Sequence, residues 1–293
     1  MAVPAPIRLS IALTGCGPIE QTVAVLQALL EDTPRRVVPH ALYATGRDVL
    51  PAALVAAGLS DGLAPSKIGT KLHRFMDGLG RSAVLGPFDF RYAQDFTDLS
   101  PVDSEAALAV EPPALPETVW REAVIEALAG AAGNATAADT AVQRIQGLAI
   151  SVIDLRAGMP VTLNPPHDLD RLMVATINPL QFPPRACSGV LAGHSAHLCA
   201  HGLIEAAAAD HRCDAVLVIR NGAHPAFVRS DIVADEAMRR AEATVIRAIE
   251  MANNRARLTG LGPSVLDGSA RTLPEEEADI MAPVMRLITR ARG

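Results

Sequence analysis

Short unbroken apolar runs alternate along this chain with longer segments whose apolar residues recur at helical spacing. The apolar runs predict buried strands over residues 7–14, 36–44, 147–155, 186–192 and 214–219. The helical spacing predicts helices that begin at Pro18 and at about residues 47, 67, 117, 136, 169, 202, 231 and 275. This alternation indicates an α/β fold, a three-layer α/β/α sandwich with a mostly parallel sheet.

Turn and capping residues refine these elements. Gly58 is expected to end the helix before it, and Asp168 is expected to cap the helix after it. The turn at 156–160 predicts that the strands on either side of it form a hairpin.

Residues 1–293 are expected to form one domain, because 49% of the residues are hydrophobic and can fill a large core. Prolines interrupt residues 80–116, which are predicted to be a loop-rich insertion or lid. Residues 231–293 are predicted to be C-terminal helices.

Composition removes several classes of partner. A net charge of −6 and a pI near 5.8 argue against a nucleic-acid-binding groove, which needs clustered Lys and Arg. No apolar run approaches the roughly 18–20 residues that span a bilayer, so no transmembrane segment is predicted. The four cysteines form no CxxC pair, which is typical of reduced thiols in a cytoplasmic protein; they are Cys16, Cys187, Cys199 and Cys213. Homo-oligomerisation stays open.

Ligands of parallel sheets bind at the carboxyl ends of strands, which here fall at Gly15, Thr45, Asp154, Gly193 and Arg220. The first of these ends opens the glycine turn T-G-C-G-P-I-E, residues 14–20. Backbone N–H groups at Gly15, Cys16 and Gly17 could bind an anion. Glu20 would repel a phosphate, so the turn does not match a dinucleotide fingerprint. A tight turn without a ligand is the simpler interpretation.

Residues 41–58, ALYATGRDVLPAALVAAG, have the pattern of a strand that turns sharply into a helix. Serine hydrolases hold their nucleophile at the apex of such an elbow. The apex here is Gly46, which has no oxygen with which to attack a substrate. An ordinary strand-to-helix connection is the alternative.

Residues 193–201, GHSAHLCAH, place four candidate metal ligands within eight residues: His194, His197, Cys199 and His201. Two histidines one helical turn apart could share a zinc ion. The same segment nearly matches G-x-S-x-G, with Ser195 as a nucleophile and His224 as its base. A polar loop of ordinary histidines is the third interpretation, and no cofactor is expected.

In order, these segments resemble the patatin-like phospholipase family. The first two resemble its opening strand with the oxyanion loop and its nucleophile elbow. The later three resemble its T/D-L-x-x-G hairpin, its proline-rich segment leading to the D-G-G motif, and the helix and strand that follow. The matching residues are 8–30, 41–57, 147–163, 169–193 and 202–219.

That family uses a serine–aspartate dyad beside a glycine-rich oxyanion loop. The resemblance aligns its serine with Gly46 and its aspartate with Ala192, and it aligns the last residues of its loop with Ile19 and Glu20. It therefore implies a lipid acyl hydrolase fold without the dyad, a pseudoenzyme that binds or scaffolds. An acyl lipid or an active homologue would be its partner. The alternatives are a serine hydrolase or acyltransferase using Ser195, and a metal-dependent protein using the 193–201 loop.

Overall fold

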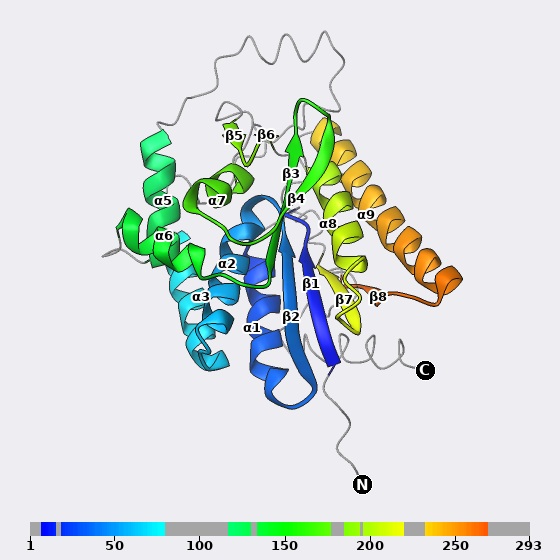
Figure 1. The fold of residues 1–293 in the computed structure, drawn as a ribbon, viewed down its shortest axis with the longest axis horizontal. Helices are drawn as coiled ribbons and strands as arrows, with labels where there is room; N and C mark the ends of the chain where they lie inside the picture. The colour runs from blue at the N-terminus through cyan, green and yellow to red at the C-terminus, as the bar shows by residue number, and fades with distance from the viewer. Residues whose placement is uncertain are drawn as a thin grey trace.

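An eight-stranded sheet with helices on both faces forms the centre of the computed structural model (Figure 1). The structure describes residues 7–15, 19–79, 117–129, 134–176, 185–193, 196–219 and 232–268. The strands are β1 (Ile7–Leu13), β2 (Val37–Ala44), β3 (Leu148–Asp154), β4 (Met159–Leu163), β5 (Arg185–Cys187), β6 (Val190–Gly193), β7 (Ala215–Ile219) and β8 (Ser264–Asp267). The helices are α1 (Ile19–Arg36), η1 (Gly46–Asp48), α2 (Val49–Ser60), α3 (Pro65–Leu79), α5 (Glu117–Ala129), α6 (Ala135–Gln143), α7 (Leu169–Thr176), α8 (Ala196–Ala208) and α9 (Ile232–Thr259).

The strand order confirms the predicted mostly parallel sheet. It runs β5-β6-β3-β2-β1-β7-β8, with β4 paired to β3. Strands β3, β2, β1, β7 and β8 are parallel, whereas β4, β5 and β6 form antiparallel pairs at one end. Leu13 of β1 is level with Ala44 of β2 and Ile219 of β7, so three carboxyl ends lie side by side.

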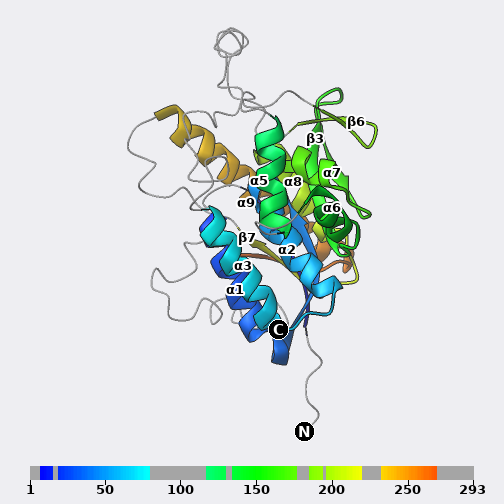
Figure 2. The same cartoon turned by 90° about the vertical axis from the view of Figure 1, so that its left-hand side faces the viewer.

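The sheet separates two hydrophobic cores. On one face α1, α2 and α7 contact the sheet, and α3, α5 and α6 pack outside these helices (Figure 2). All six helices contribute buried residues to the core on this face. On the other face α8 and α9 pack together. Residues of β1 alternate between the two cores, with Ile11 and Leu13 on the first and Ala12 on the second. Burial on both faces explains why the strands are continuous apolar runs.

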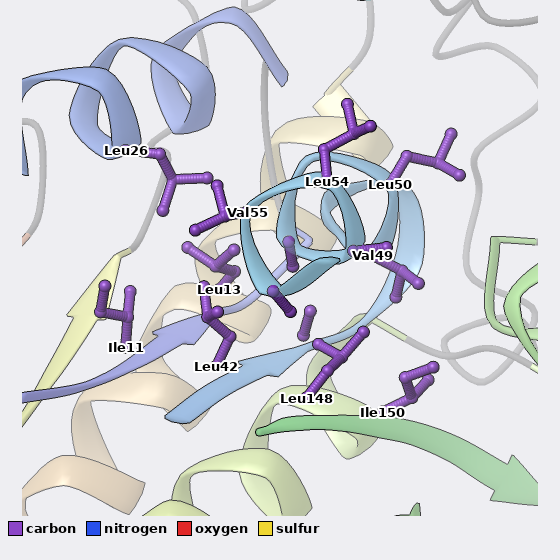
Figure 3. Close-up of a cluster of buried hydrophobic side chains, with 14 of the residues drawn as sticks. Ile11, Leu13, Leu26, Leu42, Val49, Leu50, Leu54, Val55, Leu148 and Ile150 are labelled. Atoms are coloured by element: carbon purple, nitrogen blue, oxygen red, sulfur yellow. The ribbon is translucent and has the colours of Figure 1, made fainter. Parts of the chain in front are cut away.

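Helix α2 is buried nearly all round, because it lies between the sheet and outer helices. Leu54 and Val55 on this helix belong to the cluster that also includes Leu13 and Leu42 of the sheet (Figure 3). A helix without a polar face is expected to be buried in this way. It follows directly after η1, so it fixes the position of the candidate elbow.

Three local predictions were wrong. Gly58 does not end its helix: α2 continues to Ser60, and a Cβ at Gly58 would lie 2.6 Å from Ile68 Cγ1 of α3, so close helix packing requires this glycine. The single strand predicted at 186–192 is the β5–β6 hairpin, which turns at Ser188 and Gly189 with φ of 52° and 83°. Helix α8 begins at Ala196, whereas its predicted start is about residue 202. Most of the histidine segment is therefore helical.

Other predictions were confirmed or lie outside the described residues. Asp168 caps α7, since its Oδ1 accepts a hydrogen bond from Arg171 N at 2.8 Å. The hairpin around the 156–160 turn is formed by β3 and β4. Strand β8 was not predicted. The insertion at 80–116 and the helix at 275–291 lie outside the described residues. Within the described part of the chain, none of the helices combines the length and apolar character needed to cross a membrane.

Asn253 of α9 holds edge strand β8 through its side-chain amide. Its Nδ2 donates to Val265 O at 2.8 Å, and its Oδ1 accepts from Val265 N at 2.9 Å. We expect Asn253→Ala to lower the free energy of unfolding by about 2 kcal/mol, since it leaves two partly buried backbone groups without this partner. The neighbouring exposed residue gives the matched control: Asn254→Ala should change stability by less than about 0.5 kcal/mol in urea unfolding. Equal losses would contradict the proposed role of the amide.

Candidate functional site

The sequence predicts an elbow at residues 41–58, and the structure has one there. Strand β2 ends at Ala44, Thr45 is extended, and Gly46 has a left-handed φ of 58° before η1 and α2. Thr45 fixes the end of β2, because its N–H donates to Leu13 O at 3.3 Å and its hydroxyl donates to Ser151 O at 2.9 Å. Gly46 is therefore the apex of a sharp strand-to-helix turn, the geometry that displays a nucleophile in serine hydrolases.

The glycine turn after β1 lies against this elbow. Gly15 has φ of 70°, and a Cβ at this position would lie 2.4 Å from the backbone oxygen of Thr45. Only glycine fits such an approach without a backbone shift. The structure thus brings Gly15 close to the residue before Gly46. Cys16 and Gly17, the other predicted anion-binding residues, lie outside the described residues.

A buried carboxylate joins the two turns. Asp48 is 2% exposed, and its Oδ2 accepts a hydrogen bond from Gly15 N at 3.0 Å. Its Oδ1 accepts from Thr22 Oγ1 of α1 at 2.9 Å. The N–H group of Gly15, which the sequence offered to an external anion, therefore binds the chain's own carboxylate.

Burial makes ionisation of Asp48 less favourable in the folded protein than in water. Burial raises the pKa of this carboxyl from 3.8 to about 6, and the hydrogen bonds from Thr22 and Gly15 and the charge of Arg47 oppose that rise only in part. Burial also lowers the pKa of the half-buried Arg47 guanidinium, while the charges of Glu20 and Asp48 act to raise it. A buried acid with a strongly raised pKa beside a turn of this kind marks a candidate functional site.

Ala192 occupies β6, on the far side of β3 from the elbow in the strand order. It is 2% exposed and pairs with Asp154 of β3 and Arg185 of β5. Thr45 bonds to the same strand three residues earlier, at Ser151. The predicted vestigial positions Gly46 and Ala192 thus flank β3, and neither side chain can act as nucleophile or base.

The structure separates two of the predicted metal ligands. Cys199 of α8 is fully buried, while His201, two residues later on the same helix, is half-buried and pairs with Glu205 at 3.9 Å. Residues two apart on a helix point in nearly opposite directions. No group of three His, Cys, Asp or Glu side chains suited to a metal occurs among the described residues. His194, Ser195 and His224 lie outside those residues, as does the side chain of His197, so the metal and Ser195 hypotheses stay predictions.

Sequence reasoning missed Asp48. Its signal was an acidic residue in the place of the second glycine of G-x-S-x-G, directly before the twelve uncharged residues of α2. A lone carboxylate that opens an entirely apolar helix has to be buried with it, and it must then find donors. Thr22 and Gly15 supply them, but they lie 26 and 33 residues away along the chain.

Comparison with known proteins gives distant similarity. No family model and no curated protein matches the chain. Among solved structures, it is similar to that of ExoU with SpcU, from the type III secretion system of Pseudomonas aeruginosa, with a TM-score of 0.34 and 16% identity; the match covers 84% of this chain and 53% of that chain. A second structure, of the type III effector protein ExoU, gives a TM-score of 0.32 and 14% identity, covering 85% and 54%. The chain spans about half the length of the solved proteins it matches.

Proposed function

We propose that this chain is a non-catalytic protein built on a patatin-like layout, which binds an acyl lipid or a protein partner instead of cleaving an ester. The observation that carries the proposal is the hydrogen bond of 3.0 Å between Gly15 N and Asp48 Oδ2 beside the glycine apex at position 46. An elbow of this kind needs a hydroxyl at its apex and an N–H group available for the developing oxyanion. Here the apex has no side chain, and the N–H group of Gly15 already has an anionic partner.

The electrostatics support the same proposal. Asp48 and Glu20 place two negative charges near the turn, and the single positive charge of Arg47 offsets them only in part. A tetrahedral oxyanion would be repelled by these charges, whereas an active site of this type is arranged to stabilise it. Loss of the nucleophile and loss of the base would each lower the rate by several orders of magnitude.

Ester hydrolysis tests the proposal directly. We expect the purified protein to leave p-nitrophenyl butyrate and phosphatidylcholine uncleaved and to show no labelling by a fluorophosphonate probe. The variants Gly46→Ala and Gly46→Ser form a matched pair that differs only in the hydroxyl, and we expect both to be as inactive as the parent, because Asp48 still occupies Gly15 N.

Two results would contradict the proposal. One is hydrolysis well above the uncatalysed rate by the parent protein. The other is fluorophosphonate labelling that Ser195→Ala abolishes, which would select the serine hydrolase alternative. A lipid or a second protein that copurifies at a fixed stoichiometry, identified by mass spectrometry, would support the binding function.

A further inference from the structure

We infer that the end of α9, with the groove between α8 and α9, is a docking surface for an anionic lipid bilayer. This surface is independent of the elbow. It lies where α9 leads into β8, at the amino ends of the parallel strands, whereas the elbow lies at their carboxyl ends. We call it the leucine-turn surface and define it by Met251, Arg255, Arg257, Leu258 and Leu261.

Large apolar side chains are unusually exposed there. Leu258 is 88% exposed, Leu261 is 67% exposed, and Met251 is 48% exposed. Leu258 and Leu261 stand on either side of the turn at Gly260, whose φ is 66°. The end of α9 projects from the fold (Figure 1). Single exposed apolar residues are common, but Leu258 and Leu261 lie three residues apart at this end, with Met251 two turns earlier on the same helix, and such a group indicates a contact.

A shallow hollow adjoins these side chains. It has a volume of about 220 Å³ and lies along the seam of α8 and α9. Alanines such as Ala208, Ala252 and Ala256 line it together with Met251 and Leu261. Polar residues complete its lining, namely His201, Glu205, His211, Arg255 and Thr259. The hollow therefore extends the apolar surface inward from the leucine turn, leaving room for part of an apolar chain.

The charge around the turn favours an anionic partner. Residues 251–266 include Arg255 and Arg257 and contain no acidic residue, while the exposed Glu250 lies two helical turns before Arg257. Glu205 of α8 pairs with Arg255 at 3.4 Å and so offsets one of the two charges. Arg257 leaves the last turn of α9 positive on a chain whose net charge is −6. Basic residues beside an apolar tip match the arrangement by which peripheral proteins bind anionic lipid.

A bilayer fits this surface better than a protein partner does. Stable protein interfaces bury roughly 800 Å² and 20–30 residues on each side. The exposed apolar part here consists of three large side chains at a convex helix end, which is a small area for such an interface. Insertion of two leucines into the headgroup region needs no complementary partner surface, and the two arginines add electrostatic attraction.

Vesicle flotation with matched variants tests the inference. The parent protein should float with vesicles of equimolar phosphatidylcholine and phosphatidylglycerol, and it should bind phosphatidylcholine vesicles far more weakly. The double variant Leu258→Ser/Leu261→Ser should lose affinity by roughly a hundredfold, about tenfold for each leucine. The β3–β4 hairpin supplies the control, because Leu155 is 43% exposed and Met159 is 63% exposed at the opposite end of the sheet. The variant Leu155→Ser/Met159→Ser should bind as the parent does.

A charge pair gives a second comparison that does not touch the apolar residues. Arg257→Gln should lower affinity for the anionic vesicles by about fivefold, while Arg247→Gln, at an exposed site further back on α9, should have little effect. The inference is overturned if the parent protein does not bind these vesicles, if the leucine variant binds equally well, or if the hairpin variant loses as much. A parent dimer that the leucine substitutions convert to monomer, without vesicle binding, would assign the surface to self-association instead. The elbow is unchanged in all these variants, so failure here leaves the esterase test unaffected.

Discussion

The variant Gly15→Ala is expected to lower the free energy of unfolding by about 3 kcal/mol or more. The added methyl would lie 2.4 Å from Thr45 O, a backbone atom that cannot move without disturbing the end of β2. The residue would also have to keep a φ of 70°, which disfavours any side chain. Urea unfolding followed by circular dichroism measures the loss.

Gly158→Ala is the matched control for this steric argument. Gly158 has nearly the same φ, 64°, but a Cβ there would meet no atom within 4 Å. Its substitution should cost only the left-handed backbone penalty of roughly 1 kcal/mol. If the two variants lose equal stability, the close approach of the two turns is not what makes Gly15 necessary.

The second large effect has the opposite sign: Asp48→Asn should raise stability by about 3 kcal/mol at pH 7. An asparagine has the same shape, and it can accept from Gly15 N and donate to Thr22 Oγ1, so both hydrogen bonds are kept. It removes the cost of ionising a buried acid, whose pKa rises from 3.8 to about 6 on folding. The size follows from about 1.4 kcal/mol for each pKa unit.

The pH dependence distinguishes this cause from better packing. Because the folded pKa is raised, the favourable contribution of Asp48 is fully present below pH 3.8 and is lost as pH rises through 6. The gain from Asp48→Asn should therefore be near zero at about pH 4 and grow up to about pH 7. A gain that does not change with pH would refute the charge argument. Asp48→Ala removes the same ionisation cost but also the acceptor of both hydrogen bonds, so it should be less stable than Asp48→Asn at every pH.

Much of the architecture could be predicted because apolar periodicity determines which faces are buried. Val23, Leu26, Leu29 and Leu30 repeat at helical spacing, and all four are buried on α1. Strand β8 could not be predicted in the same way. It has only four residues, and it is held at the edge by Asn253, a contact that local sequence does not reveal.

The candidate site was predictable only in its backbone. A glycine between an apolar run and an apolar helix indicates a sharp turn, so the elbow at Gly46 could be located. That Gly15 approaches Thr45, and that Asp48 occupies its N–H group, depends on the parallel pairing of β1 with β2. Contacts of this kind join residues distant in sequence, and no pattern along a single chain specifies them.

The left-handed apex has an evolutionary consequence. Glycine adopts a φ of 58° without strain, whereas a residue with a side chain at position 46 would lower the free energy of unfolding by roughly 1 kcal/mol. A mutation that introduced a hydroxyl would thus lose stability at once, and on the proposed function it would gain no hydrolytic activity while Asp48 holds the Gly15 N–H group and Ala192 supplies no base. A hydrolase site at this elbow would therefore need several coordinated substitutions, the first of them unfavourable, and stepwise selection would not favour that route.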